Sequence, residues 1–414
     1  MVDPDISGTV RRLMERGVVV HNPRTVDIGP EVDPDRISRE GVVVFGGTRI
    51  GGERTVLSAG VRLGEEGPVT VINCRLGRNV ELKSGSFRES VFLDRSNFGP
   101  GAHVREGCLV EEDAGGAHSV GLKQTILFPF VTLGSLVNFC DCLMAGGTSR
   151  KDHSEVGSSY IHFNYTPNQN KATASLIGDV PRGVMLRERP IFLGGQGGLI
   201  GPSRVGYGVV VAAGTILGDD VEDGCLVRDA GSGRSAQTFI PGYYGNPLRI
   251  INNNIIYMAN LTALDAWYRH ARGYFFEHIP LGKHLLEGAL EILKNARAER
   301  LKRVEELAEK MGRPVEIPRR GSNSGREEAD RAVCRAFHLN WRKMKEFMNS
   351  FDADGVCVEE RNRFVEAFQR KCGESKDYIG AVRSLDNASR ELGTSWLRGI
   401  VNGMFDGSRG SMSS

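Results

Sequence analysis

Residues 204–224, RVGYGVVVAAGTILGDDVEDG, repeat one pattern every six positions. In each hexad an aliphatic residue is followed directly by a small one, and the three pairs are Val205-Gly206, Val211-Ala212 and Leu217-Gly218. This period matches neither an amphipathic helix, at about 3.6, nor an alternating strand, at about 2. Six residues make one short strand and a turn, three such sides close a triangular coil, and stacked coils bury a column of aliphatic side chains. The pattern therefore predicts a parallel β-helix of hexapeptide type.

A second run keeps the same period. It has large apolar residues six positions apart, at Phe92, Phe98, Val104 and Val110. The alternative, a Gly-rich β-sandwich with accidental spacing, is disfavoured because the hexads stay in phase within each run. The phase breaks around 115–130, 143–154 and 182–196. At these breaks we expect loops extruded from the coil corners, where solenoids usually place binding residues.

The composition excludes several classes of protein. With 53 Lys and Arg against 51 Asp and Glu, the formal charge is only +2, so a nucleic-acid or membrane-surface partner has no electrostatic basis. No stretch approaches the roughly 20 apolar residues of a membrane helix, and the N-terminus lacks the apolar core of a secretory signal. The eight cysteines are too scattered for a disulfide scaffold, which predicts a cytoplasmic protein.

A different composition begins near Pro247. Of the 53 glycines, 39 lie in residues 1–250, and the apolar residues beyond that point follow helical spacing. We expect helices over 259–279, 284–312, 328–350, 358–372 and 376–403. Residues 319–328 are predicted to form a mobile Gly/Ser linker. The tail, 407–414, is predicted to be disordered.

Three stretches resemble one known family. They are VRRLMERGVVVHNPRTVDIGPEV (10–32), SEVGSSYIHFNYTPNQNKATASLIGDV (154–180) and GYGVVVAAGTILGDDV (206–221). Together they are similar to the acetyltransferase half of the bacterial bifunctional enzyme that makes UDP-N-acetylglucosamine. That family acetylates glucosamine-1-phosphate on a left-handed β-helix and uridylylates it on a separate domain. No Gly-rich nucleotide loop precedes the first stretch, so the resemblance implies an acyltransferase module, with any nucleotidyltransferase as a separate partner.

Period, composition and resemblance together define the expected fold. We predict a mainly β protein, a left-handed parallel β-helix of hexapeptide repeats followed by an α-helical C-terminal domain. The expected parts are a connector helix and extended segment (1–40), the β-helix (41–248), a helical cap (249–318) and a C-terminal helical region (329–405). The resemblance also implies a homotrimer, because family members build each active site between two prisms.

The resemblance implies a phosphate site at two cations. Arg105 and Lys123 match the family's phosphate-holding Arg and Lys. Their separation of 18 residues is one full coil, so the two side chains are expected to stack and to hold a phosphate jointly. The alternative is a pair of solvated surface cations. This alternative is supported by Gly121, which occupies the position where the family has a carboxylate.

Two further sets of residues carry over from the resemblance. Asn164, Tyr165 and Lys171 match the sugar-contacting loop, in which an amide and a phenol would bind hydroxyls and an ammonium would bind phosphate. The alternative is a loop that caps its own turns. For acetyl-CoA, or another acyl-CoA, the matching residues are Ala212, Ala213 and Arg228. The hexad needs small residues at the first two regardless, and the Arg could be an exposed strand end.

The sequence departs from the family at the general base. The family's His falls on Phe139 here. His153 and His162 lie nearby, and either is a candidate base, although a lone His is more often structural. Cys140 and Cys142 form a Cys-x-Cys pair without the second pair that a zinc site requires. No metal is therefore predicted, and both thiols are expected to be buried.

Two functions follow from these expectations. The first is transfer of an acyl group from CoA to an amino-sugar phosphate or a nucleotide amino sugar. The second is a non-catalytic trimer that binds a sugar nucleotide, or acts as a scaffold, after losing the base.

Overall fold

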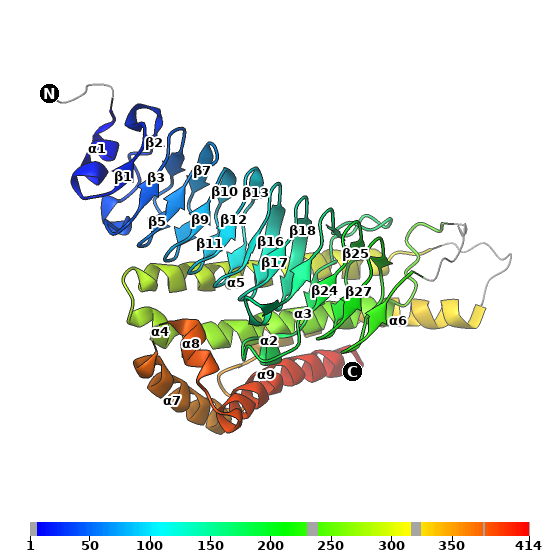
Figure 1. Cartoon of the computed structure of the whole chain (residues 1–414). Coiled ribbons are helices and arrows are strands. Elements are labelled where there is room, and N and C mark those ends of the chain that lie inside the picture. The colour runs from blue at the N-terminus through cyan, green and yellow to red at the C-terminus, as the bar shows by residue number, and fades with distance from the viewer. Residues whose placement is uncertain (1–5, 230–238, 316–323, 376, 414) are drawn as a thin grey trace.

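The computed structural model describes residues 6–229, 239–315, 324–375 and 377–413. The chain first forms a stack of triangular coils and then a group of helices that runs along one side of the stack (Figure 1). The fold is a left-handed parallel β-helix of hexapeptide repeats followed by an α-helical region, which confirms the predicted fold class.

The first face of the stack is a sheet of 11 parallel strands. Its members, in order, are β1 (Val19–Val20), β3 (Val43–Val44), β6 (Arg62–Leu63), β9 (Glu81–Leu82), β12 (Asn97–Phe98), β15 (Gly115–Gly116), β17 (Thr132–Leu133), β21 (Glu155–Val156), β24 (Phe192–Leu193), β27 (Val210–Val211) and β29 (Leu226–Val227).

The other two faces belong to one 16-stranded sheet, because two strands cross the corner between them. The second face contains β2 (Asp27–Ile28), β4 (Arg49–Gly51), β7 (Val69–Ile72), β10 (Gly85–Arg88), β13 (Ala102–Val104), β22 (Ile161–Phe163), β25 (Gly198–Ile200) and β28 (Ile216–Leu217). The third contains β5 (Val56–Leu57), β8 (Arg75–Leu76), β11 (Val91–Phe92), β14 (Leu109–Val110), β23 (Ser175–Ile177) and β26 (Arg204–Val205). The crossing strands are β16 (Gly121–Leu127) and β18 (Asn138–Met144).

The hexad positions form the core, as predicted. The hexad residues Val205, Val211 and Leu217 of the quoted stretch are almost fully buried. The apolar run in the middle coils is fully buried: Phe92, Phe98, Val104 and Val110 are each 0 % exposed. Phe87 joins this column, and its ring centroid lies 5.8 Å from that of Phe92. At the small position, a Cβ on Gly206 would lie 2.5 Å from the backbone nitrogen of Asp223. A larger residue would therefore crowd the next coil.

Pairing of coils starts early in the chain. Helix α1 (Gly8–Glu15) begins where Ser7 Oγ accepts a hydrogen bond from the backbone of Val10. Strands β1 and β2 follow, with short 3-10 turns at Pro23–Thr25 and Pro34–Arg36, and they already pair with β3 and β4. The segment 1–40 therefore contains the first coil as well as the connector helix.

The three breaks in the hexad phase have different structures. Around 115–130 the prediction of an extruded loop is wrong, because β16 runs as one strand of seven residues across the corner and pairs with both β13 and β14. The break at 143–154 contains an antiparallel hairpin of β19 (Gly147–Ser149) and β20 (Asp152–His153). The break at 182–196 follows the short helix α2 (Val180–Gly183).

The helical region covers the third face of the stack. Helix α5 packs against β8 and β11, and α3 packs against β23. The helices are α3 (Pro247–Trp267), a π-helical turn (Tyr268–Arg272), α4 (Gly273–Glu277), α5 (Gly282–Met311), α6 (Ser324–Ser350), α7 (Val358–Glu374), α8 (Tyr378–Arg383) and α9 (Asn387–Ser413). No helix in the described part of the chain is long and apolar enough to cross a membrane.

Three expectations for this region need correction. The helix expected at 376–403 is split into α8 and α9, since Asp386 accepts a hydrogen bond from the backbone of Ser389 and starts a new helix. Residues 407–413 of the tail that was expected to be disordered are helical, and Gly407 packs against the ring of Phe347, where a Cβ would meet the ring at 2.1 Å. Of the expected linker, 319–323 lies outside the described residues, and 324–328 belongs to α6.

Buried ion pairs join the helices to the coil corners. Arg272 is fully buried, and its guanidinium donates to Glu111 at 3.0 Å and to Glu112 at 2.8 Å. The ring of Tyr378 lies over the same guanidinium, with its centroid 3.6 Å from Cζ. Because a charge this deep is stable only when it is paired, these contacts fix the position of the helices on the stack.

Candidate functional site

The strand register stacks the two predicted phosphate-binding cations. Strands β13 and β16 pair Val104 with Leu122, so the following residues, Arg105 and Lys123, occupy the same corner of adjacent coils. On the next coil Lys123 pairs with Cys140. The stacking expected from their separation along the chain is therefore present.

This corner has a small excess of positive charge. Lys123 Nζ lies 2.7 Å from Glu106 Oε1, and this hydrogen bond lowers the pKa of the Glu106 carboxyl. Arg105 Nη2 lies 3.5 Å from the sulfur of Cys140, a buried thiol whose pKa is raised by burial. A phosphate at this corner would therefore meet Arg105 directly and would compete with Glu106 for Lys123.

A buried arginine supports the corner from behind. Arg300 of α5 is 4 % exposed and donates to Gln124 Oε1 at 2.9 Å and to Asp141 Oδ1 at 2.8 Å. Gln124 and Asp141 have left-handed backbones, with φ of 47° and 60°, and each directly follows a residue of the stacked column. Arg300 was not predicted from the sequence, because it lies in a charge-rich helix whose charged side chains were expected to be exposed.

The predicted sugar-contacting loop leaves the stack at the same corner. Strand β22 pairs Ile161 with Asn138, so the loop starts one coil beyond Cys140. Within the described residues, Asn164, Tyr165 and Lys171 have no hydrogen-bond or ion-pair partner, and Tyr165 is 55 % exposed.

Other residues of this loop anchor it to the helical region. Asn168 donates to the carbonyl of Tyr243 at 2.9 Å and accepts from the backbone of Gly242 at 2.9 Å. Asn254 of α3 donates to the carbonyl of Ala172 at 3.0 Å. The loop is thus fixed at its middle and end, while its three predicted ligand-contacting side chains have no partner among the described residues.

His162 is a buried histidine with both ring nitrogens engaged. Nδ1 donates to the carbonyl of Cys140, and Nε2 lies 2.8 Å from Ser175 Oγ, which accepts from the backbone of Ser203. Burial lowers the pKa of His162 to about 4, so the ring is neutral at pH 7. These contacts favour a structural role.

His153 and Phe139 lie in different environments. His153 ends the β19–β20 hairpin with its side chain 25 % exposed; Nδ1 lies 2.9 Å from the carbonyl of Arg150, and Nε2 lies 4.0 Å from Glu155 Oε2. Phe139 is fully buried and packs edge-on against Tyr160. The residue at the expected position of the base is therefore part of the core.

The predicted CoA-binding residues share another corner of the stack. Strands β27 and β29 pair Val211 with Val227, so the residues that follow, Ala212 and Arg228, lie at one corner of adjacent coils. Ala213 and Arg228 are exposed. This corner joins the first and second faces, whereas Arg105 lies between the second and third.

Cys140 and Cys142 are buried free thiols, as expected. Among the residues that the structure describes, no three His, Cys, Asp or Glu side chains gather in an arrangement that would hold a metal ion.

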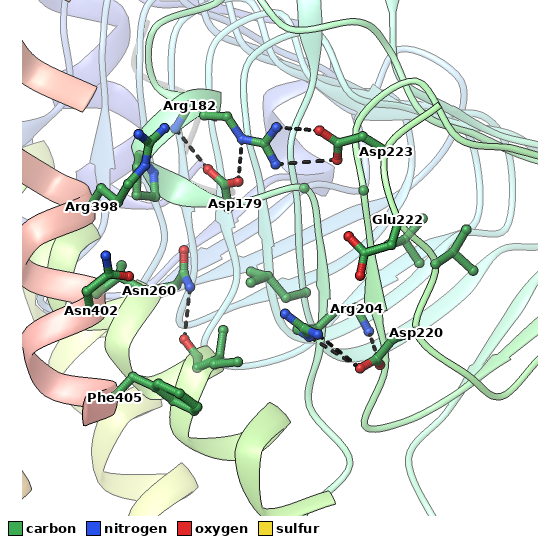
Figure 2. A pocket seen from close by; sticks show the side chains of 18 residues that line it. Asp179, Arg182, Arg204, Asp220, Glu222, Asp223, Asn260, Arg398, Asn402 and Phe405 are labelled. Atoms are coloured by element: carbon green, nitrogen blue, oxygen red, sulfur yellow. Dashed lines mark hydrogen bonds and ion pairs between the residues drawn. The ribbon is translucent and has the colours of Figure 1, made fainter. Parts of the chain in front are cut away.

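A cavity of about 480 Å³ lies elsewhere (Figure 2). It lies between the last coils on one side and α3 and α9 on the other. None of the predicted site residues lines it. The coil wall contributes Arg182, Arg204 and Glu222, and α9 contributes Arg398 and Asn402. No sequence signal indicated this cleft, because its two walls are about 200 residues apart in the chain.

Comparison with known proteins supports the resemblance. No family model matches the chain. The bifunctional protein GlmU of Thermotoga petrophila is 24 % identical over 236 residues, which are 56 % of this chain and 46 % of the relative. GlmU of Sorangium cellulosum is 27 % identical over 215 residues, 52 % of this chain and 40 % of the relative. GlmU of Listeria monocytogenes is 28 % identical over 215 residues, covering 51 % and 41 %.

The chain spans about half the length of these curated relatives. The matched length, 215–236 residues, is similar to the length of the β-helix. In sequence and in fold, the chain therefore resembles the left-handed β-helical acetyltransferase half of the bifunctional GlmU proteins.

Proposed function

We propose that the protein is a hexapeptide-repeat acyltransferase that moves an acetyl, or another acyl, group from CoA to the amine of an amino-sugar phosphate or nucleotide amino sugar. The observation that carries this proposal is the stacking of Arg105 and Lys123 at one corner of a GlmU-like β-helix. Two cations one coil apart suit the oxygens of a single phosphate group. Asn164, Tyr165 and Lys171 would then contact the sugar from the loop beside that corner.

The chemistry needs an amine nucleophile and a base. The amine attacks the thioester carbonyl, a C–N bond forms, the C–S bond breaks, the amine proton passes to the base, and the CoA thiolate leaves and takes up a proton. His153 suits the base better than His162. Its Nδ1 lies within reach of a backbone carbonyl, which leaves Nε2 as the proton acceptor, and its side chain is partly exposed.

A homotrimer would bring the two half-sites together. The acceptor corner at Arg105 and the CoA corner at Ala212 and Arg228 are different corners of one chain, so a neighbouring copy would have to supply one of them. The free faces of the late coils also present apolar side chains, which suit packing against another prism. On the first face these are Phe192, Val210 and Leu226, and on the second Ile161, Phe163, Ile200 and Ile216.

The test is the Lys123→Ala variant, with Lys294→Ala on the exposed side of α5 as its matched control. Loss of a charge-assisted contact should weaken glucosamine-1-phosphate binding by about 1.5–3 kcal/mol, tenfold or more, while leaving glucosamine binding nearly unchanged. Calorimetry measures both affinities. Equal binding of the phosphate sugar by Lys123→Ala and by the control would refute the phosphate site.

The base is tested separately by turnover. His153→Ala should lower the rate of CoA release from acetyl-CoA with little change in affinity, because a base acts in the transition state. His162→Ala serves as the comparison, since its contacts are those of a core residue. Full turnover in His153→Ala would exclude this histidine as the base.

A second function has its own supporting observation. Phe139 is a core residue at the family's base position, and His162 has both nitrogens engaged. A trimer that binds a sugar nucleotide, or acts as a scaffold without transferring an acyl group, would fit this arrangement. Calorimetry with CoA and with a UDP-sugar separates the two functions: CoA affinity supports the transferase, and UDP-sugar affinity alone supports the binding protein.

Two further expectations stay predictions. A separate nucleotidyltransferase partner would be needed if the acetylated sugar is to be uridylylated. A cytoplasmic location follows from the expected CoA substrate and the free thiols, and fractionation of cells would test it.

A further inference from the structure

We propose that the cleft between the last coils and α9 binds a small zwitterion, a molecule with one anionic group and one protonated amine, through Arg398 and Glu222. The proposal rests on the geometry of this cleft and does not depend on the acyltransferase function. At about 480 Å³ the cleft has the size of a small-molecule site.

Most charges in the cleft are already neutralised by neighbours. Arg182 Nε lies 2.6 Å from Asp179 Oδ2, and Arg182 Nη1 lies 2.5 Å from Asp223 Oδ2. Arg204 lies 3.3 Å from Asp220, which also accepts from the amide of Asn253 at 2.7 Å. These pairs form rigid walls, and none of their groups is available without breaking an ion pair.

Two charges on opposite walls are left without a protein partner. Within the described residues, neither Arg398 of α9 nor Glu222 of the last coil makes a hydrogen bond or an ion pair, and both are exposed. Figure 2 shows Arg398 on the helical side and Glu222 on the coil side. A guanidinium and a carboxylate that face one cavity from opposite sides favour a ligand with the complementary charges at its two ends.

The remaining lining suits the body of such a ligand. Asn402 and Phe405 follow Arg398 by four and seven residues, so the three share one face of α9. Asn402 adds an amide to the wall that carries Arg398, and Phe405 and Ile256 add apolar surface to the lining. The arrangement therefore fits a sugar ring or a short chain between an anion at Arg398 and an ammonium at Glu222.

Amino-sugar phosphates and ω-amino acids that carry the two charges at opposite ends share this chemistry, and the experiment separates them. Glucosamine 6-phosphate and 6-aminohexanoate serve as the two probes, with glucose 6-phosphate lacking the amine and glucosamine lacking the anion. Calorimetry on the full chain measures affinity. Hydrogen exchange of the peptides covering 204–223 and 397–405 reports whether the ligand sits in this cleft rather than at Arg105 and Lys123.

Two variants give the expected pattern. Arg398→Ala should weaken binding of the zwitterion at least about tenfold and leave binding of glucosamine unaffected, and Glu222→Gln should weaken it similarly and leave binding of glucose 6-phosphate unaffected. Matched controls are Arg342→Ala and Glu359→Gln, whose side chains are 92 % and 83 % exposed on other helices. Because both tested residues are exposed, folding should not be affected.

Protection of both peptides by one probe, lost in both variants, would support the proposal and identify the ligand class. The proposal is overturned if neither probe binds at millimolar concentration. It is also overturned if a probe binds with equal affinity to wild type and both variants, or without protecting 397–405.

Discussion

The β-helix and the helical region are specified in different ways. In the β-helix each strand contributes one or two core side chains at a fixed interval, so every coil repeats the same local rule, as at Phe92 and Phe98. In the helical region the contacts that place the helices on the stack are single charges such as Arg272 and Arg300, each bound to residues about 160 positions away. The core contacts of the β-helix are local in sequence and repeat in every coil. The ion pairs that place the helices join residues far apart in sequence, and each is a single contact.

This difference has a consequence for stability. A truncated core residue in one coil leaves neighbouring coils that bury the same kind of side chain. Loss of a buried arginine at the docking surface leaves two carboxylates without compensation. Substitution of a buried docking charge should therefore lower the free energy of unfolding more than truncation of a core residue in one coil.

The largest effect is expected from Arg272→Met. It leaves Glu111 and Glu112 buried and unpaired, and should lower the free energy of unfolding by about 3–5 kcal/mol. Chemical denaturation measures the change. The triple variant in which Glu111→Gln and Glu112→Gln accompany it should recover much of the loss, whereas Arg269→Ala, a half-exposed pair on the same helix turn, should cost about 1 kcal/mol or less. If Arg272→Met lowered the free energy of unfolding by less than about 1 kcal/mol, the docking charges would not be more sensitive to substitution than the coil repeats.

Core truncations on the two sides should come next. Leu82→Ala in β9 and Leu307→Ala in α5, both 0 % exposed, should each cost about 3 kcal/mol. Because the docking pairs couple the two regions, we expect a single unfolding transition that both variants shift. Calorimetric scans would show it. Two transitions, each moved by only one variant, would mean that the regions unfold separately.

A smaller effect concerns the pH dependence of the docking surface. Burial raises the pKa of Glu111 from 4.5 to about 7. Between these values the folded chain holds a proton that the unfolded chain releases, so this stabilisation is complete below pH 4.5 and is lost as pH rises through 7. Glu111→Gln should make the stability less dependent on pH between 4.5 and 7. A melting temperature with the same pH slope in wild type and variant would contradict the assignment.

A second effect of pH, similar in size, should have the opposite sign and lie in the β-helix. Burial lowers the pKa of His162 from 6.5 to about 4. The unfolded chain then binds a proton that the folded chain excludes, so this residue's contribution is present above pH 6.5 and is lost as pH falls toward 4. His162→Asn should reduce the loss on acidification, with His284→Asn on the surface of α5 as control. Identical acid profiles of all three proteins would contradict the prediction.

The periodic part of the molecule was predictable from the sequence and the unique part was not. Val205, Val211 and Leu217 indicated the interior of the stack because each obeys a local rule that the next coil repeats. The crossing of the corner by β16 was missed, since it depends on the left-handed backbone of Gln124, which no composition signal marks. Helical spacing likewise indicated that helices exist but not where they dock.

The same limit applied to the candidate site. The stacking of Arg105 and Lys123 follows from counting one coil, and the resemblance gave that pair a chemical meaning. Arg398 and Glu222 face one cavity only because α9 returns to the last coils, and no count along the chain brings them together. Sites within the stack were therefore accessible to sequence reasoning, and sites between the two regions required the structure.

The course of α5 along the stack limits how the protein can change length (Figure 1). One coil advances about 4.8 Å, which equals about three residues of helix. Glu291 of α5 bonds Arg75 on an early coil, and Arg300 bonds Gln124 and Asp141 on later ones. Inserting or deleting a coil between these anchors would require three residues more or fewer in α5, a change that also turns the helix by about 300°. Coils beneath α5 should thus be fixed in number through evolution, while coils beyond its ends remain open to gain and loss.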